Sequence, residues 1–149
     1  MALVIVAIVG LGVVAISDAA PRKPLKYKAW VAASAKSSGC LGRPGVYADL
    51  DTVVKPRIKL ADEKRLAKRN KPTGVRLAIG SKTYRMKLDT ATSVVSYGRI
   101  IWGLKPVHLK PKQAKALMGE RASVSYKLGD KTYRTNGIKV VDGDCKPVF

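Results

Sequence analysis

Two aspartates and one histidine are the side chains of this sequence best placed to do chemistry. Asp49 and Asp51 are two residues apart in a segment that alternates like a short strand, so both carboxylates would point to one face. Such a pair could bind a metal or act in acid–base catalysis, but charge balance on a solvated strand face is the favoured interpretation. His108 is the only histidine, so any catalytic triad would depend on it. Its apolar neighbours favour a structural histidine instead.

The other reactive residues form no known catalytic motif. Glu63 and Glu120 are the only glutamates, and both are expected at exposed helical positions. The sequence contains no nucleophile elbow, zincin helix, phosphate loop or dinucleotide fingerprint. No enzyme, metal or cofactor is therefore predicted, and loss of an activity in His108→Ala would be the minimum support for the contrary hypothesis.

Cys40 and Cys145 are the only cysteines, and their spacing fits no metal site. In an exported domain they are expected to form a disulfide between an early loop and the C-terminal strand, whereas in the cytoplasm they should stay reduced. The bond would close a loop of about a hundred residues, which is worth about 4 kcal/mol by the chain-entropy model.

The strongest signal of the chain is its charge. Twenty-nine Lys and Arg oppose ten Asp and Glu among 149 residues, which gives a net charge of +19. A field of this sign attracts polyanions such as nucleic acid, acidic lipid head groups or acidic polysaccharide. Solubility alone is the competing explanation, but positive charge of this size causes polyanion binding anyway. We therefore predict a polyanion partner.

A six-residue segment that occurs twice organises the sequence. Residues 80–85 read Gly-Ser-Lys-Thr-Tyr-Arg and residues 129–134 read Gly-Asp-Lys-Thr-Tyr-Arg, so five of the six positions are identical. Each copy follows an alternating apolar segment, at 75–79 and at 124–128. Strand, glycine turn and strand together predict a β-hairpin in both places.

Helix-favouring segments precede both hairpins, at 61–70 and 110–118. The two similar units, about 55–89 and 105–138, indicate a duplication and not a solenoid, which needs roughly three or more repeats. The predicted fold class is a β-rich α+β fold, in which two similar helix-plus-β-hairpin units pack as one small domain, preceded by an N-terminal hydrophobic helix. Trp102 is expected in the core of this domain.

The polyanion contacts are predicted on the first helix and on both hairpins. Strand alternation directs Tyr84 to the core, and Thr83 and Arg85 to solvent, so that cations would contact phosphates without reading bases. If Tyr84 and Tyr133 were instead exposed, they could stack on the bases of a single strand. The predicted polyanion-binding residues are Lys64, Arg65, Lys68, Arg69, Arg76, Lys82, Arg85, Lys87, Lys127, Lys131 and Arg134.

The N-terminal segment is strongly apolar. Residues 2–16 carry no polar side chain, and residues 1–20 are just long enough to cross a hydrocarbon core. They predict either a retained membrane anchor, slightly favoured, or a secretory signal cleaved after Ala19. An anchor followed by basic residues places the domain in the cytoplasm or inside a particle. The disulfide expectation conflicts with the cytoplasm, whereas inside a released virus-like particle both could hold. A basic linker (21–30) and a basic β-rich domain (31–149) follow.

Together these features predict a non-enzymatic, membrane-associated or exported basic protein. It would belong to a larger assembly, such as a virion or a cell envelope, and contact nucleic acid or another polyanion. Other proteins of that assembly and, through residues 1–20, a membrane are further expected partners. The alternative is a secreted, disulfide-bonded protein that binds a protein target or an acidic polysaccharide.

Overall fold

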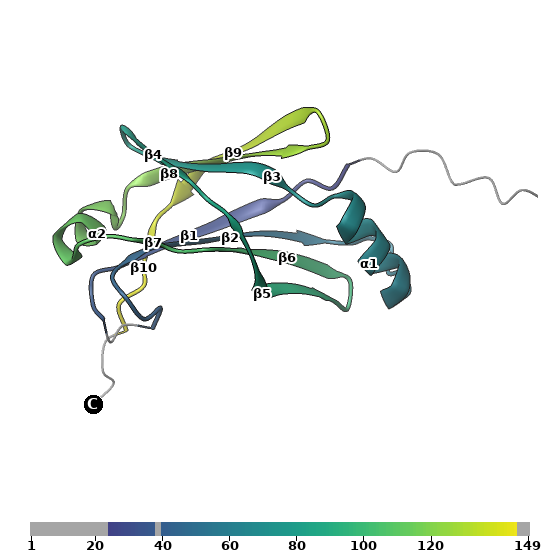
Figure 1. The fold of residues 1–149 in the computed structure, drawn as a ribbon, viewed down its shortest axis with the longest axis horizontal. Helices are drawn as coiled ribbons and strands as arrows, with labels where there is room; N and C mark the ends of the chain where they lie inside the picture. The colour runs from purple at the N-terminus through teal and green to yellow at the C-terminus, as the bar shows by residue number, and fades with distance from the viewer. Residues whose placement is uncertain (1–23, 38–39, 146–149) are drawn as a thin grey trace, which may run out of the picture.

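The computed structural model describes residues 24–37 and 40–145, which form two β-sheets and two short helices (Figure 1). The strands are β1 (Lys28–Ser34), β2 (Gly45–Val53), β3 (Thr73–Ile79), β4 (Lys82–Arg85), β5 (Leu88–Ser96), β6 (Arg99–Leu104), β7 (Val107–His108), β8 (Arg121–Leu128), β9 (Lys131–Lys139) and β10 (Val141–Asp142). The helices are α1 (Leu60–Arg69) and α2 (Pro111–Leu117).

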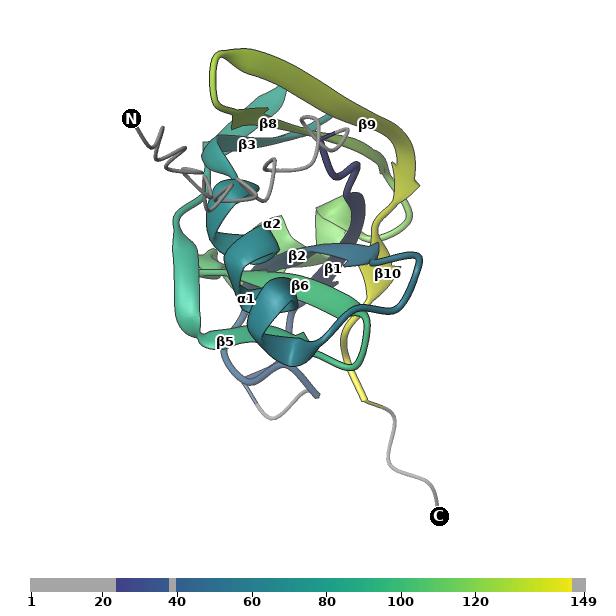
Figure 2. The ribbon, with the colours of Figure 1, turned by 90° about the vertical axis from the view of Figure 1, so that its right-hand side faces the viewer.

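The two sheets pack face to face around one core. The lower sheet of Figure 1 has the strand order β10-β1-β2-β6-β5, with β7 paired to β2. The upper sheet has the order β4-β3-β8-β9. Viewed end-on, α1 lies in front of the space between the sheets and α2 lies behind it (Figure 2). The helices therefore close the two ends of the sandwich.

Strand alternation explains how each sheet builds its share of the core. In β3, Val75, Leu77 and Ile79 are buried while Arg76 between them is exposed. In β8, Val124 and Tyr126 are buried in the same way. Because successive side chains of a strand point to opposite faces, each strand gives one apolar face to the core and one polar face to solvent.

The order of elements repeats along the chain. A strand hairpin, a helix and a second strand hairpin occur first as β1-β2-α1-β3-β4 and then as β5-β6-α2-β8-β9. The two copies meet at the centre of both sheets, where β2 pairs antiparallel with β6 and β3 pairs antiparallel with β8. Figure 1 shows the consequence, since α1 and α2 lie at opposite ends and the β3–β4 and β8–β9 turns point in opposite directions.

A buried hydrogen-bond network connects the two sheets at Tyr27, just before β1. Its hydroxyl donates to the backbone oxygen of Asn70 at 2.8 Å and accepts from the indole nitrogen of Trp102 at 3.0 Å. Its backbone nitrogen donates to the hydroxyl of Tyr126 on the upper sheet at 2.9 Å. Burial raises the pKa of the Tyr27 phenol to about 12. Trp102 is in the core, as the sequence predicts.

The predicted fold class is wrong. Strands account for 53% and helices for only 14% of the described chain, so it is mostly β and not α+β. Each helix buries only two residues, Glu63 and Ala67 in α1 and Ala114 and Leu117 in α2, so the core is built mainly from the strands. An N-terminal hydrophobic helix is not evident among the described residues, and residues 1–20 lie outside them. Within 24–37 and 40–145, no helix is long and apolar enough to cross a membrane.

The C-terminal segment is joined to the loop between β1 and β2 at one end of the lower sheet. Cys40 and Cys145 form a disulfide across 105 residues of sequence, with Cα atoms 5.0 Å apart. Beside it, one carboxylate oxygen of Asp144 accepts hydrogen bonds from the Ser34 hydroxyl at 2.7 Å and the Ala35 backbone nitrogen at 2.8 Å. These hydrogen bonds lower the pKa of the Asp144 carboxyl, and the one from the Ser34 hydroxyl contributes most. The C-terminal segment is thereby anchored to the end of β1.

Candidate polyanion-binding surface

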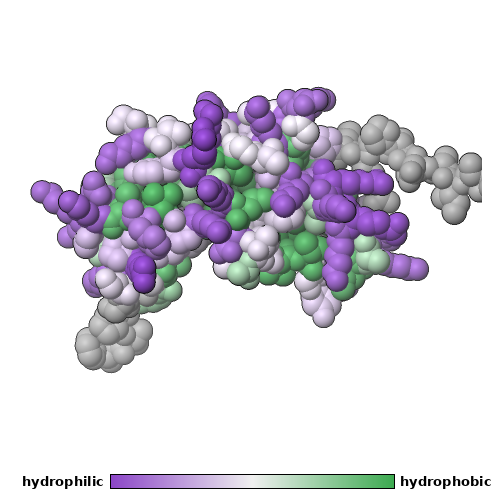
Figure 3. All heavy atoms as spheres, in the orientation of Figure 1, coloured by the Kyte–Doolittle hydropathy of each residue, from purple (hydrophilic) through white to green (hydrophobic). Residues whose placement is uncertain are grey.

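The upper sheet carries a one-sided charge. Its four strands contain eight Lys or Arg and no Asp or Glu. The strands of the lower sheet contain two cations, Lys28 and Arg99, and the four acids Asp49, Asp51, Asp89 and Asp142. Of the two sheets, only the upper one therefore carries an excess of positive charge on its strands. Hydrophilic side chains stand along the top of the molecule, over the upper sheet, in Figure 3.

A row of basic side chains crosses the outer face of the upper sheet. Arg76 of β3 pairs with Arg85 of β4 on one side and with Ser125 of β8 on the other. Ser125 in turn pairs with Arg134 of β9. All three arginines are exposed, because these positions alternate with the buried ones. The row thus crosses all four strands, and Ser125 separates Arg76 from Arg134.

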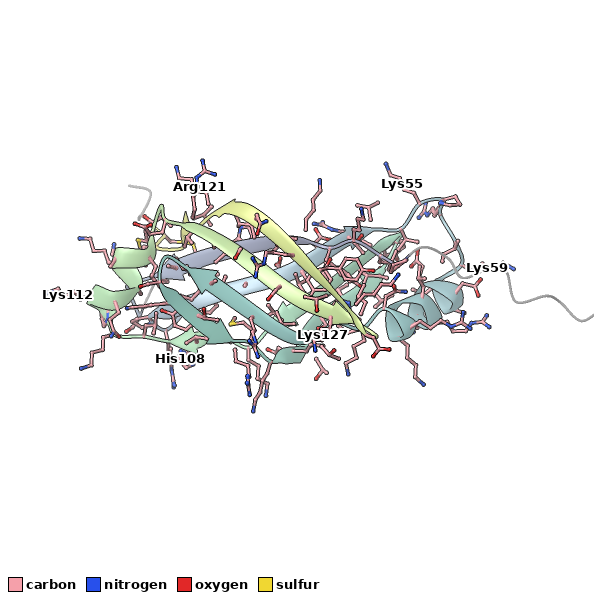
Figure 4. The ribbon with its side chains drawn as sticks, turned by 90° about the horizontal axis from the view of Figure 1, so that it is seen from above. Lys55, Lys59, His108, Lys112, Arg121 and Lys127 are labelled. Atoms are coloured by element: carbon pink, nitrogen blue, oxygen red, sulfur yellow. A yellow bond between two sulfur atoms is a disulfide. The ribbon has the colours of Figure 1, made fainter. Side chains whose placement is uncertain are left out.

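Further cations extend this face along β8 and β9. Arg121 pairs with Lys139, and Lys127 pairs with Thr132. Figure 4, which looks down on the upper sheet, shows Arg121 and Lys127 at opposite ends of β8. We call the set of six cations on this face, with Ser125, the basic face; it consists of Arg76, Arg85, Arg121, Ser125, Lys127, Arg134 and Lys139.

Like charges lie directly opposite each other at two places on the basic face. Arg76 is opposite Arg85, and Arg121 is opposite Lys139. Such cross-strand pairs destabilise a sheet, whereas opposite charges stabilise it. The lower sheet uses the stabilising arrangement, with Lys28 opposite Asp51 and an ion pair between Arg99 and Asp51. Stability alone therefore does not explain the charges of the basic face.

The tyrosines of the repeated hairpins lie behind the basic face. Tyr84 and Tyr133 are half-buried and pack against the core, which confirms the predicted orientation of Tyr84. The Tyr133 ring stacks on that of Tyr126, with centroids 5.7 Å apart and planes 16° from parallel. An arrangement with both tyrosines exposed for stacking on bases does not fit this geometry. The tyrosine rings therefore lie on the opposite side of the sheet from the arginines.

The structure divides the other predicted binding residues into separate groups. Lys82 and Lys131 are exposed, but their side chains lie on the opposite side of their strands from the basic face. Lys87 follows the end of β4. The helix residues Lys64, Arg65, Lys68 and Arg69 are exposed on α1, at one end of the sandwich. Arg65 makes an ion pair with Asp62 at 2.6 Å. The hairpin prediction missed Arg121 and Lys139, although the alternation of β8 could have included Arg121.

The residues expected to do chemistry lie on the lower sheet. Asp49 and Asp51 share one face of β2, as predicted, and line an open groove of about 410 Å³ together with Lys28, Trp30 and Arg99. Burial raises the pKa of Asp49 most, and the nearby Asp51 carboxylate raises it further. Trp30 is 42% exposed beside it. Asp51 is held by the Arg99 guanidinium in a two-pronged ion pair.

His108 and Glu63 do not line this groove. His108 is exposed on the two-residue strand β7, whose partner in the sheet is β2. Glu63 is buried, against expectation, and accepts a hydrogen bond from the Gly98 backbone nitrogen at 2.6 Å. Residues 24–37 and 40–145 contain no group of three or more His, Cys, Asp or Glu that could hold a metal ion.

Searches of protein-family models, of curated proteins and of solved structures gave no match to this chain.

Proposed function

We propose that this chain is a non-enzymatic basic binding protein whose basic face contacts a polyanion. The observation that carries the proposal is the segregation of charge between the sheets, with eight cations and no acid on the strands of the upper sheet. Cations distributed only for solubility would occur on both sheets. Rows of Arg and Lys without base-reading groups suit the phosphates or sulfates of a polymer, which are bound by charge and position.

Two features make the basic face suitable for this role. Its cations lie on strands, which hold side chains more rigidly than loops do. Among the described residues, none of the six cations of the basic face forms an ion pair, since the ion pairs there are those of Arg65 and Arg99. The guanidinium groups are therefore available to pair with phosphate, for which their fork geometry is well suited.

The test compares two triple variants of the full-length chain. One replaces Arg76, Arg85 and Arg134 with Ala; the matched control replaces three exposed lysines away from the basic face, Lys28, Lys36 and Lys112. Both lose the same net charge. Binding to labelled DNA, heparin and anionic lipid vesicles is measured between about 50 and 200 mM salt, a range in which counterion release causes large affinity losses.

We expect the arginine variant to lose more affinity than the control for the polyanion that the wild-type protein binds. On DNA, the slope of log K against log salt should fall by up to about 2.7, because each lost phosphate contact contributes about 0.9 and three arginines are removed. Equal losses in both variants would show that total charge, and not the basic face, is responsible. Wild-type binding that does not change with salt would refute the electrostatic interaction itself.

A second function is favoured by the disulfide between Cys40 and Cys145. Disulfides persist in oxidising compartments, so the domain would then be a secreted protein that binds a protein target or an acidic polysaccharide. The intact mass of the native protein without reductant discriminates between the two. A chain that starts near Ala20 and is two hydrogens light supports the secreted form.

A further inference from the structure

The repeat in the sequence is a rotational symmetry in the fold. The repeated segments align Val75-Arg76-Leu77 with Val124-Ser125-Tyr126, so Arg76 and Ser125 are equivalent positions. In the structure these two residues lie directly opposite each other in the β3–β8 pair. Equivalent residues can face each other across an antiparallel pair only where a two-fold axis passes between them.

The lower sheet contains the same relation. Alignment of Lys55-Pro56 with Lys105-Pro106 makes Asp51 equivalent to Ile101. These two residues are also directly opposite each other, in the β2–β6 pair. The centre of each sheet is therefore a meeting point of equivalent positions, and the helices at the two ends exchange places under the same rotation (Figure 1).

The axis emerges at the centre of the basic face. The local two-fold axis of an antiparallel strand pair is perpendicular to the sheet, so this axis points outward beside Arg76. Arg85 and Arg134 are equivalent in the repeat, and they lie on the strands to either side. The face consequently has one central arginine and two flanking arginines related by the axis.

We infer that the basic face binds an antiparallel nucleic acid duplex, with the two-fold axis of the protein on a two-fold axis of the duplex. This inference depends on the proposed polyanion function and names its ligand class. The two backbones of a duplex run in opposite directions, so the duplex has two-fold axes perpendicular to its length. Proteins with two-fold symmetry use this correspondence when they bind DNA.

The dimensions of the row fit two phosphate backbones. Neighbouring strands are about 4.8 Å apart, so Arg85 and Arg134, three strand spacings apart, have Cα atoms separated by roughly 14 Å. The minor groove of B-DNA is about 6 Å wide and the major groove about 12 Å wide. Long arginine side chains can adjust to either width, reaching the backbone on each side of a groove while Arg76 lies over the groove between them.

A single strand fits this surface less well. It has one backbone with one direction, so it gives no reason for Arg85 and Arg134 to act alike. Proteins that bind single strands without sequence preference also stack bases on aromatic rings. The tyrosines next to these arginines, Tyr84 and Tyr133, instead pack against the core. The basic face thus offers cations for two backbones and no stacking platform for bases.

The test uses the symmetry directly. Arg85→Ala and Arg134→Ala are made separately in the full-length chain, with Lys28→Ala as the single-charge control. Affinity is measured by fluorescence anisotropy for a short DNA duplex, an RNA duplex of the same sequence and the corresponding single strands, at about 50 and 200 mM salt. Arg85→Lys and Arg134→Lys show whether charge at these positions is sufficient, and thermal unfolding shows that each variant is folded.

The expected result has two parts. The wild-type protein binds at least one duplex, DNA or RNA, more tightly than the matching single strand. On that duplex each arginine variant loses the same number of phosphate contacts, so its affinity depends less on salt. The factor by which affinity falls from about 50 to about 200 mM salt should be about 3.5-fold smaller in each variant than in the wild type. The lysine replacements retain the wild-type salt dependence, and Lys28→Ala changes it less than the arginine variants do.

Other results separate this inference from the proposed function. Single strands or heparin bound as tightly as a duplex, with the basic-face variants still impaired, would refute the duplex and leave polyanion binding in place. Unequal effects of Arg85→Ala and Arg134→Ala on the duplex would refute the shared axis. No effect of either variant on any polyanion would refute both proposals.

Discussion

Replacement of Tyr27 by Phe tests how the two sheets are held together beneath the basic face. The Tyr27 side chain is only 2% exposed, and its hydroxyl joins the Trp102 indole to the backbone oxygen of Asn70. Phe fills nearly the same volume but lacks the hydroxyl. The substitution therefore leaves one buried donor and one buried acceptor without a partner, while the apolar packing is preserved.

The expected loss follows from those two groups. A buried polar group that loses its partner costs about 1–3 kcal/mol, so Tyr27→Phe, which leaves two such groups, should lower the free energy of unfolding by roughly 2–6 kcal/mol. Denaturant titration followed by far-UV circular dichroism measures this loss. Tyr97→Phe is the control, because Tyr97 is 86% exposed and its replacement should change stability by less than about 0.5 kcal/mol.

The same phenol predicts a dependence on alkaline pH. Its pKa is about 12 in the folded protein and about 10 in an unfolded chain, so the unfolded state loses the proton first as pH rises. The contribution of this phenol to the free energy of unfolding is fully present below pH 10. About 3 kcal/mol of it is lost as pH rises from 10 to 12. The stability of Tyr27→Phe should fall less steeply over that window than that of the wild type. Equal stabilities and parallel pH profiles would refute the network.

Two further substitutions test the charges of the two sheets. Asp49→Asn should stabilise the protein at neutral pH, because the raised pKa of Asp49 means that its ionisation costs stability as pH rises through that pKa. The difference from the wild type, measured by denaturant titration, should shrink at acidic pH. Arg85→Thr should raise the free energy of unfolding by about 0.2–1 kcal/mol, because Arg85 lies opposite Arg76, and it should weaken polyanion binding in the same preparation.

The hairpins and helices could be predicted because their signals are local. The glycine turns expected at Gly80 and Gly129 join β3 to β4 and β8 to β9, and both glycines have φ of 57°. Only glycine adopts such a conformation without cost, so the residue type itself marks the turn. The helices predicted at 61–70 and 110–118 are observed within a residue or two of those bounds, at α1 and α2.

The fold class and the composition of the site could not be predicted in the same way. The class was wrong because the long strands β2, β5 and β9 hold more residues than both helices do. The basic face depends on which strands become neighbours, and the β3–β8 pairing joins residues almost fifty positions apart. No local pattern contains that register. Lys139 was missed for the same reason, since its place beside Arg121 depends on the β8–β9 register, whereas the alternation of β8 could have included Arg121.

The arrangement of charge also bears on why the fold holds eight cations on one sheet. Like charges opposite each other reduce stability, and a phosphate polymer that lies across them replaces repulsion with attraction. A ligand that binds only the folded state stabilises it in proportion to its affinity, so the unliganded protein is the form that carries this cost. The lower sheet shows that the chain can neutralise a cation on a strand, because Asp51 lies next to both Lys28 and Arg99. The absence of any acid on the strands of the upper sheet is therefore better explained by a ligand than by the needs of folding.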